Sequence, residues 1–335
     1  QPSTINHQPS TINHQPSTIK IIMSQISQTG LQSSWFYALW KFSRPHTIYG
    51  TSLSVLGLYL ISIALTNSNF PFPNSYSLVS LLGAWIACLS GNVYIVGLNQ
   101  LQDVEIDKIN KPHLPVASGE FTQRTGEIIV TITGVLALGL SWLLGPFLFG
   151  MVAISLAIGT AYSLEPIRLK RFPFWAAICI FSVRGAIVNL GLFLHFSWVL
   201  QAKQSIPPTV WTLTWFILIF TIAIAIFKDI PDMEGDRQYN ITTFTIKLGK
   251  QTVFNLSRWL LTVCYAGMVL VGILGFTQVN SIFSIGFHFL ILGFMWWRTQ
   301  QTDLQDQSSI ASSYKFIWKL FYIEYLIFPI SCLLV

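Results

Sequence analysis

Long apolar runs alternate with polar connections along most of the chain. Nine runs are long enough to cross a bilayer as helices, which takes about 17–25 residues. We place them at 47–66, 78–101, 125–144, 147–164, 174–196, 210–228, 252–276, 281–297 and 315–335. The connections after the odd-numbered runs are short or nearly uncharged, whereas those after the even-numbered runs are long and basic. This pattern predicts an all-α, polytopic membrane protein whose long loops cap one end of a helical bundle over a central cavity.

Composition agrees with this prediction. The 335 residues are 52% hydrophobic and 10% charged, with a mean hydropathy of +0.57. Because a soluble domain carries about 25% charged residues, soluble enzymes, including soluble terpene synthases, are excluded. The four cysteines are scattered singly through apolar runs, so we expect neither disulfides nor a zinc site.

The basic residues predict an orientation. Of the 19 Lys and Arg residues, all but Lys203 and Arg184 lie before the first run or near the ends and connections of one side. The positive-inside rule then places the N-terminus and this loop-rich side in the cytoplasm, and the C-terminus on the far side.

The N-terminal end differs in sequence pattern from the rest of the chain. Its first 20 residues repeat Q-P-S-T-I-N-H without an apolar face or a signal-peptide pattern. We expect residues 1–34 to be a disordered or non-native segment, with Met23 as the natural start. Residues 35–335 then form one membrane domain.

An acidic cluster follows the second apolar run, in N-Q-L-Q-D-V-E-I-D-K-I-N-K-P at 99–112. Asn99, Asp103 and Asp107 are spaced i, i+4 and i+8, which predicts one polar stripe on a helix. Glu105 points away from that stripe. For any single acid, a solvated helix end is an equally good explanation, but the shared face weakens it here.

A second acidic cluster, K-D-I-P-D-M-E-G-D-R at 228–237, follows the sixth run. Asp229, Asp232 and Asp236 again share one helical face, although a helix end dissolving into a loop would also place acids there. Two oxygen-rich clusters on the same membrane face predict Mg²⁺ held between them with a diphosphate, since Mg²⁺ is usually bound by a few carboxylates plus substrate phosphates.

Basic residues near the clusters are candidates for diphosphate binding, although each could equally be a topology-setting charge. They are Arg44, Lys111, Lys170, Arg171 and Lys228. Arg44 and Lys170 are the stronger candidates.

Three further polar residues are candidates for binding an aromatic substrate. Arg184 lies inside an apolar run, where an arginine usually faces a cavity or a partner acid. Asn189 is a weaker polar neighbour five residues on, and Tyr162 ends the fourth run. A membrane-end tyrosine is more commonly an interfacial anchor.

These motifs resemble the UbiA superfamily of intramembrane prenyltransferases, from about Arg44 to the C-terminus. The N-Q-L-Q-D form, the N-K-P-H-L-P-V-A-S-G-E loop and K-D-I-P-D-M-E-G-D are most similar to the homogentisate prenyltransferase branch. Chlorophyll synthases, which are close relatives, typically have N-E-P-x-R-P in that loop, and Lys111 and Leu114 depart from that pattern.

The resemblance implies a reaction and roles. Asn99, Asp103, Asp107, Asp232 and Asp236 would hold Mg²⁺ and a prenyl diphosphate, with Asp103 and Asp107 essential for catalysis. Asp229 would orient or deprotonate the phenol, and Arg184 would meet the aromatic substrate. The expected reaction is prenylation of homogentisate with loss of carbon dioxide, giving 2-methyl-6-phytylbenzoquinol if the donor is phytyl diphosphate.

Alternatives stay open at this point. A geranylgeranyl or solanesyl donor, a chlorophyll synthase activity and, in another class, a membrane transporter remain possible from the residues. We expect the substrates and the lipid bilayer as partners, with neither nucleic acid nor an obligate protein partner. A thylakoid or plasma membrane of a photosynthetic bacterium is the expected location.

Overall fold

The computed structural model describes residues 34–66, 75–202, 205–238, 243–275 and 277–335. The predicted start at Met23 and nearly all of the segment 1–34 lie outside these residues, as does Lys203. The described part is helical and contains no strand. Its helices are α2 Trp35–Phe42, α3 Pro45–Leu65, α4 Ser75–Gln102, α5 Val104–Asn110, α6 Gln123–Leu144, α7 Pro146–Ser163, the 3₁₀ turn η1 Leu169–Arg171, α8 Pro173–Phe181, the π-helical turn η2 Ser182–Ile187, α9 Val188–Val199, α10 Pro208–Phe227, α11 Asp229–Gln238, α12 Phe244–Leu248, α13 Lys250–Leu274, α14 Ser281–Gln300 and α15 Gln307–Leu333.

Nine candidate membrane spans occur in the described residues, and each falls on one of the predicted apolar runs. The prediction of an all-α, nine-span membrane protein is therefore confirmed. The largest difference is the last span, which begins at Gln307 rather than at 315. Asp306 caps this helix by accepting hydrogen bonds from the backbone N–H groups of Ser308 and Ser309, so the helix starts within a polar stretch that hydropathy alone does not reveal.

Local sequence explains where other helices begin and end. Prolines occupy the first turn of α3, α7, α8 and α10, where the missing N–H costs nothing. Gly145, with φ +132°, separates α6 from α7, and this backbone conformation is open to glycine but strained for other residues.

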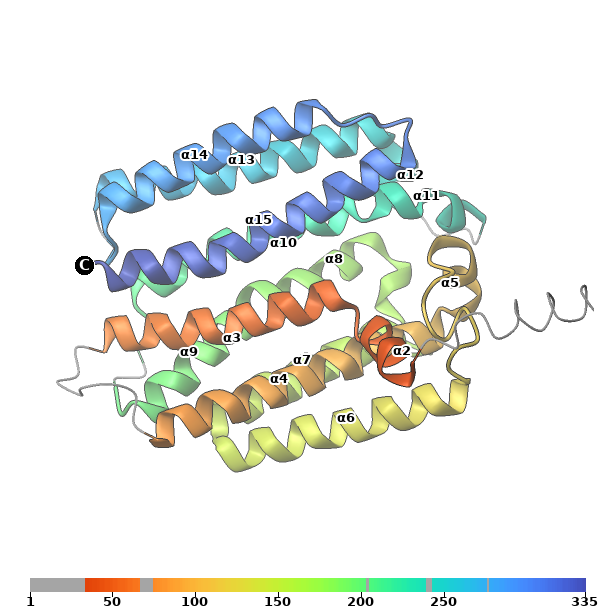
Figure 1. Ribbon diagram of the computed structural model, residues 1–335, viewed down its shortest axis with the longest axis horizontal. Helices are drawn as coiled ribbons and strands as arrows, with labels where there is room; N and C mark the ends of the chain where they lie inside the picture. Colours follow the sequence, from red (N-terminus) through yellow and green to blue (C-terminus); the bar gives the residue numbers. More distant parts are fainter. Residues whose placement is uncertain (1–33, 67–74, 203–204, 239–242, 276) are drawn as a thin grey trace, which may run out of the picture.

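The helices lie roughly side by side, so the bundle has two distinct ends (Figure 1). The short helices α5, α11 and α12 gather at one end, and the C-terminus lies at the other (Figure 1). We call the end that carries α5 and α11 the rim.

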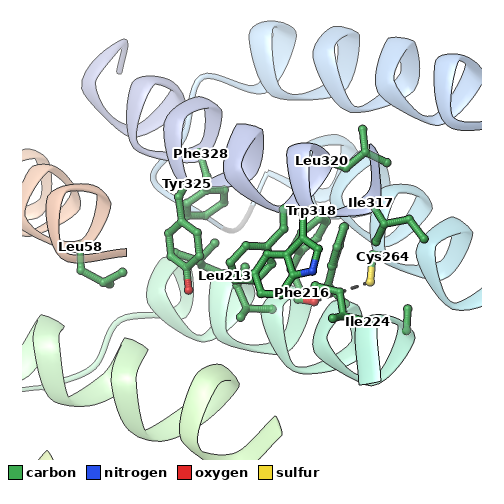
Figure 2. Packing of buried hydrophobic residues seen from close by; sticks show 14 of the residues in the cluster. Leu58, Leu213, Phe216, Ile224, Cys264, Ile317, Trp318, Leu320, Tyr325 and Phe328 are labelled. Carbon is green, nitrogen blue, oxygen red and sulfur yellow. Dashed lines mark hydrogen bonds between the residues drawn. The ribbon is translucent and has the colours of Figure 1, made fainter. Parts of the chain in front are cut away.

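The core lies where α10 and α15 meet their neighbours. Figure 2 shows Trp318 and Tyr325 projecting from α15 into the space between α15 and α10. Many large apolar side chains on outer helix faces are exposed instead, such as Leu143 at 80% and Ile282 at 88%, as expected for surfaces that meet lipid. The rim carries both acidic clusters, on the α4–α5 segment and on α11.

Candidate active site

A cavity of about 1510 Å³ opens among the rim helices and continues into the bundle. This volume exceeds the roughly 300–1,000 Å³ of most small-molecule sites. Both acidic clusters contribute to its lining, together with residues from α3, α4, α7, α10 and α15. The sequence therefore correctly anticipated a cavity beneath the rim loops.

The first acidic cluster spans a break between two helices. α4 ends at Gln102 and α5 begins at Val104, with Asp103 between them at φ −114°, ψ 18°. The prediction of one continuous helical stripe is wrong in this respect. Asn99 nevertheless donates a hydrogen bond to Asp103 Oδ2 over 2.9 Å and accepts one from Arg44 Nη2 over 3.3 Å. The break changes the direction of the chain, but the side chains of Asn99 and Asp103 stay in contact.

Asp107 is the most buried acid of this cluster. It is 4% exposed, and its Oδ2 atom has no hydrogen-bond partner within the described chain. The nearest cation is Arg44, whose Nη2 lies 3.9 Å from Oδ2. Burial raises the pKa of Asp107 to about 6, although Arg44 and Lys111 oppose that shift. A buried carboxylate oxygen without a donor is a place where a cation is favoured.

The second cluster lies on α11, as the spacing predicted. Asp229, Asp232 and Asp236 all line the cavity. Asp229 pairs with Lys228 over 3.4 Å. Burial, together with the neighbouring charges of Asp232 and Asp229, raises the pKa of Asp236 to about 7.

The two clusters meet across the cavity mouth. Lys111, which follows α5, lies 2.6 Å from Asp232 Oδ2. Asn110 donates to Asp236 Oδ1 over 3.5 Å. Residues more than 120 positions apart in sequence therefore face each other, and one small anion with its counterions can reach both clusters.

The loop between α7 and α8 supplies cations to the first cluster. Lys170 hydrogen-bonds Asp103 Oδ1, and Arg168 Nη2 lies 3.1 Å from the same atom. Burial lowers the pKa of Lys170, while the Asp103 carboxylate opposes the change. Arg171 also borders the cavity but is more exposed and pairs with Glu165.

Arg168 was not anticipated from the sequence. It reaches Asp103 because its backbone turns through a left-handed conformation, with φ +36°. Its place in the basic R-L-K-R stretch was the available signal. Lys315 and Lys319 on α15 were also missed, although both line the cavity.

The donor atoms suit Mg²⁺. Within the residues that the structure describes, no three acidic, histidine or cysteine side chains converge as a preformed metal site. Mg²⁺ needs no such site, since it is commonly held by one or two carboxylates plus substrate phosphates and water. The unpartnered Oδ2 of Asp107 and the facing carboxylate of Asp232 fit that mode of binding.

Arg184 faces the cavity from η2, the π-helical turn between α8 and α9. Its guanidinium carbon lies 4.8 Å from the Trp318 ring centroid and 5.9 Å from that of Phe321. In the described part of the chain no carboxylate lies within ion-pair distance of it. Aromatic faces therefore hold this cation in place, and its charge stays available to a ligand.

Tyr162 and Asn189 lie in different environments. Tyr162 lines the cavity close to Lys228 and Asp229. Asn189 is 0% exposed and is not among the described residues that line the cavity. Its amide donates to the Gly185 carbonyl over 2.7 Å and accepts a 2.7 Å hydrogen bond from the Tyr325 hydroxyl. The prediction that Asn189 contacts a substrate is corrected: it ties α9 to α15.

Known proteins resemble this chain over most of its length. Residues 54–320 match the model of the UbiA prenyltransferase family. Homogentisate phytyltransferase of Synechocystis is 52% identical over 88% of this chain and 95% of its own. Homogentisate phytyltransferase 1 of Arabidopsis thaliana is 40% identical over 87% of this chain and 74% of its own. Homogentisate geranylgeranyltransferase of Triticum aestivum is 37% identical over 87% of this chain and 72% of its own.

Solved structures share the fold at lower identity. A digeranylgeranylglyceryl phosphate synthase aligns with a TM-score of 0.59 and 20% identity, covering 90% of this chain and 99% of its own. A UbiA homologue from Archaeoglobus fulgidus, solved with GPP and Mg²⁺, aligns with a TM-score of 0.59 and 15% identity, covering 89% and 100%. These likenesses bear on the fold alone.

Proposed function

Because the chain belongs to the UbiA prenyltransferase family, we propose that it prenylates homogentisate. The donor is phytyl diphosphate, and the product is 2-methyl-6-phytylbenzoquinol, a tocopherol precursor. The names of the relatives support the acceptor and the donor. The observation that carries the mechanism is the meeting of two carboxylate clusters, bridged by Lys111 and Asp232, at the mouth of a deep and largely apolar cavity.

The donor's diphosphate binds between the clusters. Arg44, Lys170 and Lys111 present their charges there, and Lys228 and Arg171 also line the cavity. Asn99, Asp103 and Asp107 on one side and Asp232 and Asp236 on the other would hold Mg²⁺, which supplies charge neutralisation for the departing diphosphate. When the diphosphate binds, Lys111 and Lys170 exchange their present carboxylate partners for phosphate oxygens.

The acceptor binds deeper, against Arg184. The guanidinium meets the carboxylate of homogentisate, and Trp318 fixes the guanidinium from behind. Asp229 accepts the proton of the phenol, and Tyr162 hydrogen-bonds at the same end of the cavity. The electron-rich ring carbon then forms a bond to the prenyl carbon as the carbon–oxygen bond to diphosphate breaks.

The remaining steps restore the aromatic ring and complete the product. The ring carbon loses its proton, and Asp229 returns a proton to the phenol oxygen. The side chain loses carbon dioxide, and the methylene left behind takes up a proton to become the methyl group. An allylic cation requires a site with little water, because water would trap it as an alcohol. Apolar side chains such as Val55, Met151 and Val188 make up the interior of the cavity.

The membrane setting follows from the charges. The rim carries most of the basic residues and, by the positive-inside rule, faces the cytoplasm. The N-terminus lies on that side and the C-terminus on the other. A thylakoid or plasma membrane of a photosynthetic bacterium is the proposed location, which agrees with a cyanobacterial relative.

Geranylgeranyl or solanesyl donors are the nearest alternatives, because a relative at 37% identity is named for geranylgeranyl transfer. Chlorophyll synthase activity is less favoured, since Lys111 and Leu114 depart from the loop that such enzymes typically have. A transporter is disfavoured because the acids crowd one end of the bundle.

The test uses homogentisate labelled separately in its ring and in its carboxyl group. Purified protein with Mg²⁺ and phytyl diphosphate is expected to move the ring label into a lipid-soluble product and to release the carboxyl label as carbon dioxide. Chlorophyllide serves as the competing acceptor. Prenylation of chlorophyllide alone, or no lipid-soluble product with any prenyl diphosphate, contradicts the proposal.

A further inference from the structure

His46 lines the cavity, but the chemistry described so far gives it no role. It is the second residue of α3 and is partly buried. Within the described chain, neither nitrogen of its imidazole ring has a hydrogen-bond partner. Because buried polar groups are normally hydrogen-bonded, a partly buried imidazole beside a cavity and without a protein partner is available to a ligand.

The protein holds His46 in place without using its ring nitrogens. Arg44 turns through a left-handed conformation, with φ +51°, and Pro45 then begins α3. From α15, the Tyr322 hydroxyl donates a 2.7 Å hydrogen bond to the His46 carbonyl oxygen. The imidazole ring packs edge-on against the Trp318 ring, with 4.9 Å between their centroids. The ring is therefore oriented, while its nitrogens stay free.

Trp318 connects His46 with Arg184, the residue proposed to meet the carboxylate of the acceptor. The guanidinium carbon of Arg184 lies 4.8 Å from the Trp318 ring centroid. Trp318 is only 4% exposed, and its ring also contacts those of Phe321 and Tyr322. The guanidinium and the imidazole thus lie against one fixed indole, and a molecule the size of a substituted benzene ring can reach both.

Homogentisate has three polar groups, a carboxylate on the acetate at ring position 1 and hydroxyls at positions 2 and 5. In the product, the methyl and phytyl groups lie on either side of one hydroxyl, so the new bond forms at the ring carbon next to the position-2 hydroxyl. That hydroxyl is the one closest to the donor and to Asp229. The position-5 hydroxyl lies across the ring and needs a partner of its own.

His46 and Asp229 belong to different sides of the cavity. Asp229 begins α11, directly after α10, whereas His46 lies at the start of α3. The long helix α15 packs against both α10 and α3 (Figure 1). Because the two hydroxyls point in opposite directions from the ring, an acceptor with one hydroxyl at Asp229 turns the other towards α3.

The other polar groups that line this side suit a hydroxyl less well. Lys315 and Lys319 of α15 are exposed, and an ammonium group can donate hydrogen bonds but not accept them. The Tyr322 hydroxyl already donates to the His46 carbonyl oxygen. An imidazole nitrogen can accept the hydrogen bond that a phenolic hydroxyl donates, so His46 is the best partner available there.

We propose that His46 binds the position-5 hydroxyl of homogentisate and so makes the site specific for a ring with two hydroxyls. Arg184 holds the carboxylate, Asp229 the position-2 hydroxyl and His46 the hydroxyl across the ring. Three contacts on three segments fix the plane of the ring as well as its position. The proposal rests on the proposed function, which supplies the acceptor, and adds the residue that distinguishes it from phenols with a single hydroxyl.

Two variants and two analogues test this assignment. His46→Phe keeps an aromatic ring against Trp318 but cannot hydrogen-bond, whereas His46→Gln keeps an oxygen that accepts. The analogue 2-hydroxyphenylacetate lacks the position-5 hydroxyl, and 3-hydroxyphenylacetate lacks the position-2 hydroxyl. His113→Phe is the matched control, because His113 also lines the cavity but is exposed in the loop after α5.

The readout is a ratio of dissociation constants, measured by calorimetry with Mg²⁺ and unreactive geranylgeranyl thiodiphosphate present. The unaltered protein is expected to bind homogentisate about tenfold more tightly than 2-hydroxyphenylacetate, which is the scale of one hydrogen bond. His46→Phe should reduce this preference to about twofold or less, and His46→Gln should retain part of it. His113→Phe should leave it unchanged. Such ratios do not depend on the fraction of protein that folds.

The second analogue shows whether the effect is local. In His46→Phe, the preference for homogentisate over 3-hydroxyphenylacetate should persist, because Asp229 still meets the position-2 hydroxyl. A preference over 2-hydroxyphenylacetate that survives in His46→Phe, that is lost together with the preference over 3-hydroxyphenylacetate, or that is missing from the unaltered protein overturns the proposal.

Binding and turnover together separate this proposal from the proposed function. If the unaltered protein prenylates homogentisate but His46→Phe keeps its preference, the function stands and the assignment of His46 is wrong. If homogentisate is not prenylated while the preference that depends on His46 is measured, the function is wrong and His46 remains a hydroxyl-binding residue. If homogentisate neither reacts nor binds, both are wrong.

Discussion

Asp107 and Glu105 lie two residues apart in one short helix and differ sharply in exposure. The Asp107 side chain is 6% exposed and faces the cavity, whereas Glu105 is 66% exposed and pairs with Lys108. The sequence spacing had separated these two acids correctly. Because they share charge and helix, they form a natural pair for testing the role of the cavity.

Asp107→Asn is expected to lower kcat/KM for prenyl transfer by about 100-fold or more, because a carboxylate that would hold the Mg²⁺ needed to neutralise the departing diphosphate is lost. Glu105→Gln is expected to change kcat/KM by no more than about twofold. Initial rates at saturating Mg²⁺ measure both. Equal losses in the two variants would show that charge at the rim in general, rather than the cavity-facing carboxylate, matters.

Arg184→Lys is expected to raise KM for homogentisate about tenfold and to leave KM for the donor nearly unchanged. Lysine keeps the positive charge but loses the planar, two-pronged contact with a carboxylate and the stacking on Trp318. Steady-state kinetics with each substrate varied in turn measures the effect. If the donor's KM rises instead, Arg184 belongs to the diphosphate site.

Residue-scale prediction from sequence worked where helical periodicity applies and failed where the chain departs from it. Asp232 and Asp236 share a face because α11 is a regular helix. Arg168 escaped notice because a left-handed turn, with φ +36°, carries it to Asp103. Asn189 was misassigned because its partner Tyr325 is 136 residues away in sequence, and nothing in the local pattern reveals that contact.

At the scale of elements, the Asn189–Tyr325 hydrogen bond joins α9 to α15 beside the cavity. Both side chains are essentially fully buried, at 0% and 1% exposed. Removing one partner leaves a polar group unsatisfied, at a cost of about 1–3 kcal/mol, while replacing both by apolar groups can be nearly neutral. This asymmetry distinguishes a structural contact from a substrate-binding one.

Asn189→Leu alone is expected to lower Tm clearly, and Asn189→Leu combined with Tyr325→Phe is expected to recover much of the loss. KM for homogentisate should stay near that of the unaltered protein in every folded variant. Thermal unfolding in detergent and substrate-dependent rates check the two parts. A large rise in this KM with an unchanged Tm would restore Asn189 to the substrate site.

The helix break at Asp103 is also an element-scale feature that spacing did not reveal. Hydropathy predicted the end of α4 to within two residues. At the switch to α5, Asp103 contacts Arg168 and Lys170 from another loop, and the local sequence does not reveal these contacts. The sequence therefore predicted the existence of the helices better than the way they join at the site.

At the scale of the whole molecule, an odd number of spans places the rim and the C-terminus at opposite ends (Figure 1). The nine apolar runs were enough to predict this arrangement, because each must cross the bilayer as a helix. The sequence predicted that the two acidic clusters approach each other because both follow apolar runs that end on the same membrane face. In the structure, contacts between the α5 end and α11 bring the clusters together.

Cysteine labelling tests the proposed orientation. A cysteine at Gln305, which is exposed in the connection on the rim side, is expected to resist an impermeant maleimide in intact cells and to react after lysis. A cysteine at Val335 should react in intact cells that carry the protein in their plasma membrane. The unaltered protein, with its four native cysteines, is the background control. The reverse pattern would place the rim outside the cytoplasm.

The central claim is that carboxylates from two separate helices hold one diphosphate together with Mg²⁺. Calorimetric titration of the purified protein with geranylgeranyl thiodiphosphate, with and without Mg²⁺, measures it directly. The expected result is Mg²⁺-dependent binding that weakens at least about tenfold in Asp107→Asn and, separately, in Asp232→Asn, but not in Glu105→Gln. Unchanged, Mg²⁺-independent affinity in either aspartate variant would contradict the account.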